Sequence, residues 1–113
     1  MSDKQLFPKP SELVTEKQKD FVTEIPAGLT SRDDLFKALQ DKLKLPNYFG
    51  HNWDALQECL EDLSWIKQRR VIIIHRDVPA LKQKDIAEYR DVLATSSQHW
   101  VSSGEHELLV AFP

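Results

Sequence analysis

The sequence of 113 residues is poor in cysteine and glycine and has no long apolar stretch. Its single cysteine, Cys59, excludes an intramolecular disulfide framework and fits a reducing compartment. Three glycines are too few to build a glycine-rich phosphate-binding loop. Residues 1–20 contain no apolar run of signal-peptide length, and no window approaches a membrane span. These absences predict a cytoplasmic protein that makes no use of a membrane.

Metal-binding and nucleic-acid-binding patterns are also missing. The four histidines are His51, His75, His99 and His106. None of them are paired at i,i+4 and no cysteines accompany them, so we expect no metal site and no cofactor. Cys59 has no histidine that the sequence would place beside it, and we interpret it as a small buried hydrophobic residue. A pI near 5.8 argues against nucleic acid as the main partner and favours a basic protein.

The length and composition fit one globular domain with a modest core. With 41% apolar and 29% charged residues, the chain has the composition of an ordinary folded protein. Residues 1–18 are polar and contain two prolines, so we expect a loosely ordered N-terminal extension followed by a folded domain at residues 19–113. Four apolar side chains of the extension could instead dock on the domain: Leu6, Phe7, Leu13 and Val14.

Three apolar segments predict β-strands, at residues 21–25, 71–74 and 108–112. The second and third segments are apolar at every position, which is typical of strands covered on both faces in parallel sheets. No β-hairpin signal joins the strands, so we expect parallel pairing through right-handed crossovers. The predicted fold class is therefore α/β, a small layered sandwich with a three-stranded parallel β-sheet flanked by helices.

Capping residues and helical periodicity predict three helices, two after the first strand and one after the second. Thr30 or Ser31 can cap the first helix, and Pro46 should stop it. Asn52 is the expected N-cap of the second helix. The third helix covers the apolar positions of residues 86–100 and is followed by a glycine-containing break.

The second predicted helix carries the most distinctive pattern in the chain. From His51 to Ser64 there are four acidic residues and no lysine or arginine. On a helix these acids fall within a sector of about 100°, with apolar residues on the opposite side. The other 14 acidic residues are outnumbered by the 15 lysines and arginines, so the net charge of −3 arises on this face. The acids are Asp54, Glu58, Glu61 and Asp62, and the apolar residues are Trp53, Leu56, Leu60 and Leu63.

A solvated helix face is the ordinary interpretation of such a charge run, but two details favour a binding surface. Like charges at i,i+4 repel each other, and no lysine is interleaved to relieve the repulsion. Tyr48 and Phe49 precede the helix, and aromatic residues beside charges are typical of interface anchors. One of these two rings could equally belong to the core.

Acid–base catalysis is a further hypothesis for the same helix. Asp54 and Glu58 lie one turn apart and could act as the carboxylate pair of a small hydrolase. His51 would be the third residue of such a site. Such chemistry usually needs one carboxylate desolvated in a cleft, which an exposed helix face does not offer. We therefore predict that the protein is not an enzyme.

The segment Leu45–Leu60, LPNYFGHNWDALQECL, closely resembles the helix-and-loop signature of the barstar family of intracellular ribonuclease inhibitors. The resemblance extends from about Lys19 to Pro113 and implies a three-stranded parallel sheet packed by helices. It also implies inhibition of a secreted, guanyl-specific, barnase-like ribonuclease, whose active site is occluded by the acidic helix and the preceding loop. We expect such a protein to be bacterial, antitoxin-like, and monomeric when free of its basic ribonuclease partner.

The resemblance implies a partner-binding site and no catalytic site. By motif position, Tyr48 would cover the catalytic histidine of the ribonuclease. Asp54 and Glu58 would pair with its phosphate-binding bases, and Glu58 would mimic a phosphate. The residues that would surround these three are Phe49, Gly50, Asn52, Gln57 and Glu61.

The chain departs from the family pattern at three places besides its extension, residues 1–18, which has no counterpart. Gln57 stands where the family has a tryptophan, and Glu58 stands where it has an aspartate. Residues 94–97, ATSS, hold no acid where the family has one late in its last helix. A barstar-like interaction module that regulates another basic protein is therefore the alternative to a ribonuclease inhibitor.

Overall fold

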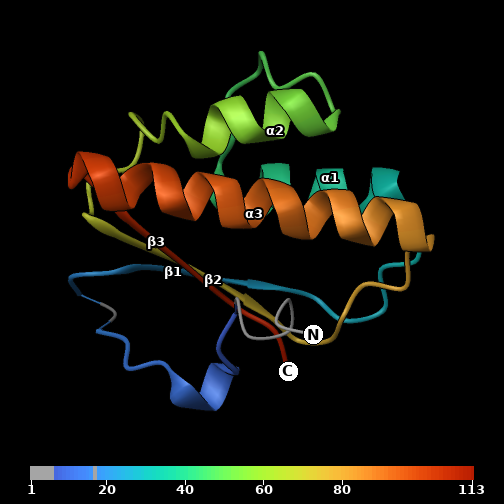
Figure 1. The fold of residues 1–113 in the computed structure, drawn as a ribbon, viewed down its shortest axis with the longest axis horizontal. Helices are drawn as coiled ribbons and strands as arrows, with labels where there is room; N and C mark the ends of the chain where they lie inside the picture. Colours follow the sequence, from blue (N-terminus) through green and yellow to red (C-terminus); the bar gives the residue numbers. More distant parts are fainter. Residues whose placement is uncertain (1–6, 17) are drawn as a thin grey trace.

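Figure 1 shows the fold in a computed structural model, which describes residues 7–16 and 18–113. A short 3-10 helix, η2, precedes the order strand, helix, helix, strand, helix, strand. The order and kind of the strands and α-helices are those predicted from the sequence. The bounds are η2 Pro10–Glu12, β1 Phe21–Ile25, α1 Arg32–Leu43, α2 Trp53–Leu60, β2 Arg70–His75, α3 Gln83–Ser103 and β3 Glu107–Ala111.

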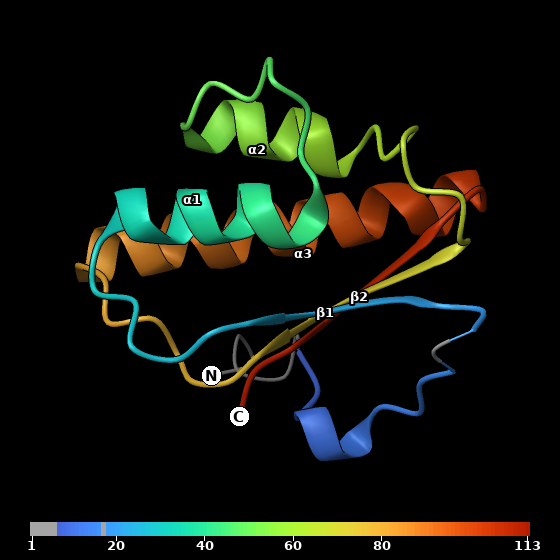
Figure 2. The same cartoon turned by 180° about the vertical axis from the view of Figure 1, so that it is seen from behind.

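The strands form one sheet in the order β1-β2-β3, and both pairs are parallel. Val71 of β2 lies opposite Phe21 of β1 and Leu108 of β3. Because both crossovers move in the same direction across the sheet, a right-handed sense places all three α-helices on one face. Figures 1 and 2 show α1 and α3 over the sheet and α2 in an outer layer above them. The predicted α/β fold is confirmed, and it brings α2 to the surface.

Local backbone signals fix both ends of α1. The hydroxyl of Ser31 accepts the backbone N–H of Asp34 at 3.1 Å, so Ser31 is the N-cap. The helix ends before Pro46, because Lys44 takes the left-handed conformation with φ 58°. The start of α1 was thus predicted by its cap, whereas the helix ends at Leu43, three residues before the proline.

Two tryptophan side chains cap the C-terminal ends of the first two α-helices. Trp65 donates its indole N–H to the carbonyl oxygen of Leu43, the last residue of α1, at 3.0 Å. Trp100 of α3 donates to the carbonyl oxygen of Leu60, the last residue of α2, at 2.7 Å in a buried position. The last carbonyl groups of a helix lack intrahelical partners, and these bonds satisfy one in each helix. The Trp100 bond also ties α2 to α3.

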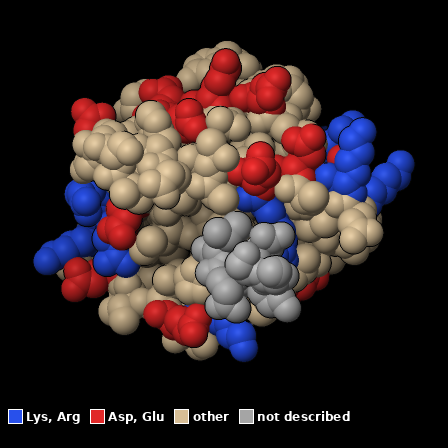
Figure 3. Space-filling model, viewed as in Figure 1, with Lys and Arg blue, Asp and Glu red and all other residues tan. Residues whose placement is uncertain are grey.

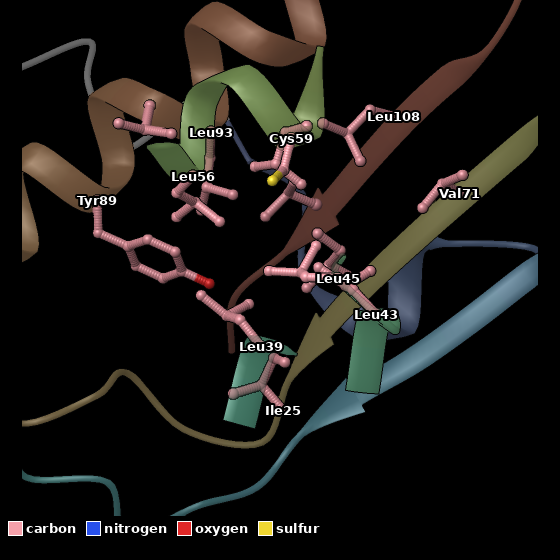
Figure 4. Close-up of a cluster of buried hydrophobic side chains, with 14 of the residues drawn as sticks. Ile25, Leu39, Leu43, Leu45, Leu56, Cys59, Val71, Tyr89, Leu93 and Leu108 are labelled. Carbon is pink, nitrogen blue, oxygen red and sulfur yellow. The ribbon is translucent and has the colours of Figure 1, made fainter. Parts of the chain in front are cut away.

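The main core lies between the sheet and the helices (Figure 4). Alternate residues of each strand point into it and meet apolar side chains from all three α-helices. Cys59 of α2 is 1% exposed among them, and burial raises the pKa of its thiol. Cys59 is therefore a small buried hydrophobic residue, as predicted. The other core residues labelled in Figure 4 are Ile25, Leu39, Leu43, Leu45, Leu56, Val71, Tyr89, Leu93 and Leu108.

The N-terminal segment lies against the opposite face of the sheet. Ile72 alternates with the core residues of β2 and yet is fully buried. Figures 1 and 2 show η2 and the chain after it on this side of the sheet, whereas Phe7 packs against the main core beside α3. The second face of the sheet is thus covered by chain that precedes β1, rather than by a helix layer.

Part of this segment contacts the domain directly. The rings of Phe7 and Phe112 pack with centroids 5.3 Å apart, and the N–H of Phe112 donates to the carbonyl oxygen of Pro8 at 3.1 Å. Val14 is 79% exposed and so does not dock, and Leu6 lies outside the described residues. The boundary between extension and domain stays a prediction.

His75, at the end of β2, is buried and held in one tautomer. Its Nδ1 donates to the carbonyl oxygen of Ala111 at 2.9 Å, so Nε2 accepts the hydroxyl of Tyr89 at 2.7 Å. The ring stacks on Phe112 with centroids 4.0 Å apart. Burial lowers the pKa of His75 to about 4, and burial also raises the pKa of Tyr89. His75 is therefore neutral at pH 7.

We predict that His75 makes the fold sensitive to acid. Between pH 6.5 and about 4, the unfolded chain binds a proton at this histidine that the folded chain does not. The free energy of unfolding therefore falls as the pH decreases, by about 3 kcal/mol across the whole range. Urea unfolding at several pH values should show a smaller pH dependence for His75→Gln than for the wild type. Equal pH dependence of the two proteins would contradict this prediction.

Replacing Trp100 by phenylalanine should weaken the attachment of α2 to α3. Trp100→Phe leaves the buried carbonyl group of Leu60 without its donor and removes part of a buried ring. We expect a loss of about 2–4 kcal/mol in the free energy of unfolding. Trp65→Phe removes the equivalent bond at a part-buried position and should cost less. Urea unfolding at pH 7 measures both costs, and the opposite ranking would show that the Trp100 bond is not the stronger one.

Candidate protein-binding site

The loop before α2, residues 44–52, folds back along the helix that follows it (Figures 1 and 2). We name this segment the Tyr48 loop. Asn52 ends it as the N-cap of α2, with its side-chain oxygen accepting the N–H of Ala55 at 2.8 Å, as predicted. The amide nitrogen of Asn52 donates to the carbonyl oxygen of the exposed Gly50 at 3.3 Å, and His51 between them has φ 53°. The Tyr48 loop and α2 therefore form one continuous surface.

Helix α2 has an apolar and an acidic side, but it is shorter than predicted. Leu56 and Leu60 are fully buried, whereas Asp54 and Glu58 are exposed. The helix ends at Leu60 and is followed by its C-terminal cap at the next residue. Two of the four acids therefore lie on the helix proper.

The expectation of one helical face with four acids is thus wrong in its second half. The N–H groups of Asp62 and Leu63 both donate to the carbonyl oxygen of Cys59, so the regular helical pattern ends here, and the carbonyl oxygen of Leu60 accepts the indole N–H of Trp100. Leu63 then turns the chain with φ 50°. Glu61 sits at the helix end as the cap, and Asp62 lies in the turn beyond it.

The acidic residues of this surface are not neutralised by neighbouring cations. Within residues 7–16 and 18–113, no lysine or arginine forms an ion pair with any of the four. Figure 3 shows acidic side chains gathered over the upper part of the molecule, where α2 lies. The surface around α2 therefore carries uncompensated negative charge. A shallow hollow on it is lined by Asp54, Gln57, Glu58 and Glu61.

Two hydrogen bonds join side chains within the site. The amide nitrogen of Gln57 donates to the carboxylate of Glu61 at 3.1 Å. The hydroxyl of Tyr48 donates to the carboxylate of Asp62 at 3.0 Å, and this bond raises the pKa of the Tyr48 phenol. The Tyr48 ring is nevertheless 65% exposed. An aromatic ring thus stands at the surface next to the acidic residues.

One aromatic residue of the Tyr48 loop belongs to the core and the other to the surface. Phe49 is only 5% exposed and packs edge-on against Phe36 of α1, with ring centroids 5.7 Å apart. Its ring is therefore not available to a partner and instead holds the loop on α1. Tyr48 is the aromatic side chain that the loop offers to solvent.

The arrangement around His51 favours binding over acid–base chemistry. Nε2 of His51 donates to the side-chain oxygen of Gln40 in α1 at 2.7 Å. Asp54 and Glu58 are both exposed, so neither carboxylate is desolvated in a cleft. Residues 7–16 and 18–113 contain no cluster of three or more His, Cys, Asp or Glu side chains placed to hold a metal ion. Among the same residues, no helix combines the length and apolarity needed to cross a membrane.

Helix α3 also contributes to this surface, through a groove that includes two residues of the acid-free segment 94–97 noted in the sequence. This shallow groove joins Glu61 to α3, and the α3 side of the groove has no acid. The bonds of Trp100 to Leu60 and of Tyr48 to Asp62 span 40 and 14 residues, so no local pattern could indicate them. The α3 residues that line the groove are Ala94, Thr95, Gln98, His99 and Ser102.

Comparison with known proteins identifies the family of this fold. No curated protein matches the sequence. A family model described as Barstar (barnase inhibitor) matches residues 21–112. The match begins at the first residue of β1, extends one residue beyond β3, and includes the Tyr48 loop and α2. The chain therefore belongs to the barstar family.

Proposed function

We propose that the protein inhibits a basic, barnase-like ribonuclease by covering its active site with the Tyr48 loop and α2. One observation carries the proposal. In a chain of the barstar family, the surface around α2 has four carboxylates without cationic partners among the described residues, beside an exposed tyrosine ring. A ribonuclease binds phosphate through basic side chains, so this surface is complementary to its active site.

Asp54 and Glu58 supply the central contacts in this proposal. Both are exposed on one helix, where they can meet the phosphate-binding bases of the ribonuclease, and Glu58 takes the place of a phosphate. Tyr48 covers the catalytic histidine with its exposed ring. Gln57 and Glu61, joined by their hydrogen bond, flank these contacts.

The remaining residues of the proposed site act through the backbone of the Tyr48 loop. Phe49 holds the loop on the core, and Asn52 joins it to the start of α2. Gly50 provides the carbonyl group to which Asn52 donates. On this proposal the protein is a cytoplasmic inhibitor, monomeric when free, that acts by binding alone and catalyses no reaction.

A barstar-like module that binds another basic protein is the second candidate. Two features of the site favour it. Gln57, where the family has a tryptophan, is hydrogen-bonded to Glu61 and offers no aromatic ring. The groove between Glu61 and α3 is free of acidic residues on its α3 side. Both features alter the border of the site and leave Asp54 and Glu58 in place.

We predict that Asp54→Ala and Glu58→Ala each weaken inhibition of barnase, because each leaves a basic side chain of the ribonuclease buried without its partner. The usual cost of removing one member of such a pair is about 2–5 kcal/mol, which is roughly a 30- to 5,000-fold loss of affinity. This range is a general one to which the barnase–barstar pair itself contributed. Inhibition constants measured with a fluorogenic RNA substrate give the effect directly.

Glu24→Gln is the matched control for these two variants. Glu24 is exposed on β1, where it accepts a hydrogen bond from Arg76, and its loss removes one negative charge away from α2. We expect its inhibition constant to stay within about twofold of the wild type. Full inhibition by folded Asp54→Ala and Glu58→Ala would refute the assigned site. A wild type that inhibits neither barnase nor other microbial ribonucleases would favour the second candidate.

We also predict that association with barnase slows steeply with salt. The uncompensated carboxylates attract a basic partner over distances that dissolved ions screen, because the Debye length falls from about 30 Å at 0.01 M to about 3 Å at 1 M. Stopped-flow association rates should fall by roughly tenfold or more over this range. The association rate of the double variant Asp54→Ala/Glu58→Ala should depend less on salt than that of the wild type. Equal salt dependence of the two proteins would show that the charges that speed association lie outside Asp54 and Glu58.

A further inference from the structure

We propose that Asp62 is a positioning residue of the binding site, which holds the Tyr48 ring in the orientation that a ribonuclease partner meets. This inference rests on the proposed function. The observation behind it is the 3.0 Å hydrogen bond from the Tyr48 hydroxyl to the Asp62 carboxylate. The bond joins the loop before α2 to the turn after α2, so it links the two ends of the helix.

The backbone of the Tyr48 loop is already fixed without this bond. The N–H of Phe49 donates to the carbonyl oxygen of Pro46 at 3.0 Å, and the Phe49 ring is buried in the core. Asn52 fixes the other end of the loop as the N-cap of α2. What is left free is the side chain of Tyr48, which is 65% exposed. Its hydroxyl bond to Asp62 is therefore the contact that selects the direction of the ring.

The position of Asp62 differs from that of the acids on α2. It follows the C-terminal end of the helix, where the helix dipole is negative and a carboxylate is disfavoured. The left-handed turn at Leu63 keeps Asp62 outside the helix, within reach of the Tyr48 hydroxyl. A hydroxyl donor offsets the unfavourable position of the carboxylate. Asp62 is thus suited to hold Tyr48, whereas Asp54 and Glu58 are free to face a partner.

A ring that is oriented before binding loses less freedom when the complex forms. We therefore expect Tyr48→Phe, which keeps the ring and every charge, to weaken barnase binding by about 3- to 10-fold. Asp62→Ala should weaken barnase binding by a similar factor. The double variant Tyr48→Phe/Asp62→Ala should bind barnase with the affinity of the single variant that binds less tightly. Asp62→Asn, which keeps an acceptor oxygen, should recover part of the loss. Surface plasmon resonance on immobilised barnase measures all five proteins.

The free protein supplies a second readout that a purely structural role for Asp62 would not change. Nuclear magnetic resonance with ring-labelled tyrosine should show contacts between the Tyr48 ring and the turn after α2 in the wild type. These contacts should be lost in Asp62→Ala, while the buried Tyr89 ring serves as an internal control. The phenol of Tyr48 should also titrate closer to its ordinary pKa of 10.0 in Asp62→Asn than in the wild type.

The outcomes separate this inference from the proposed function. If the wild type binds barnase and both Tyr48→Phe and Asp62→Ala bind it with the same affinity, the positioning role is overturned and the proposed function stands. Additive losses in the double variant would overturn it as well, because Asp62 would then act through its own charge. Tighter binding by Asp62→Ala would show that the bond opposes binding. Absence of wild-type binding would overturn both the proposed function and this inference.

Discussion

A single buried hydrogen bond, from the indole N–H of Trp100 to the carbonyl oxygen of Leu60, anchors the acidic surface to the rest of the fold. It holds the last carbonyl group of α2 at the point where the helix ends and Leu63 turns the chain. Asp62 consequently leaves the line of the helix and reaches the hydroxyl of Tyr48. The same bond joins α2 to the 21-residue helix α3, so the outermost layer of the fold is held by the layer beneath it.

Helix α2 depends on this support because it is weak by itself. It has eight residues, and isolated helices of that length are marginal in water. Repulsion between Asp54 and Glu58, one turn apart, costs a few tenths of a kcal/mol. Full burial of Leu56 and Leu60 contributes about 1.5–3 kcal/mol each, which outweighs that repulsion, and the Asn52 cap adds to it. The core side of the helix thus stabilises an outer side on which charge can be concentrated.

Much of the fold could be predicted from local sequence, because local chemistry determines it. The β-branched run at residues 71–74 fixes the central strand, and Asn52 fixes the start of α2. The end of α2 could not be predicted, since no glycine or proline marks it and the donor that satisfies its last carbonyl group is Trp100, 40 residues away in sequence. Adjacent Tyr48 and Phe49 looked equivalent, and only the packing against α1 separates the exposed ring from the buried one. The fold brings the predicted site residues together around α2, but their division into exposed and supporting side chains could not be predicted from local sequence.

On the proposed function, the same surface implies a partner with a compact cationic centre and a more neutral border. Asp54 and Glu58 place two charges on one helix, while the amide of Gln57 is bound to Glu61 and the groove beside α3 lacks an acid on its α3 side. Charge pairs contribute most where a complex excludes water and little at a wet rim. The central pair therefore sets the strength of binding, whereas the neutral border selects which basic active site fits against it.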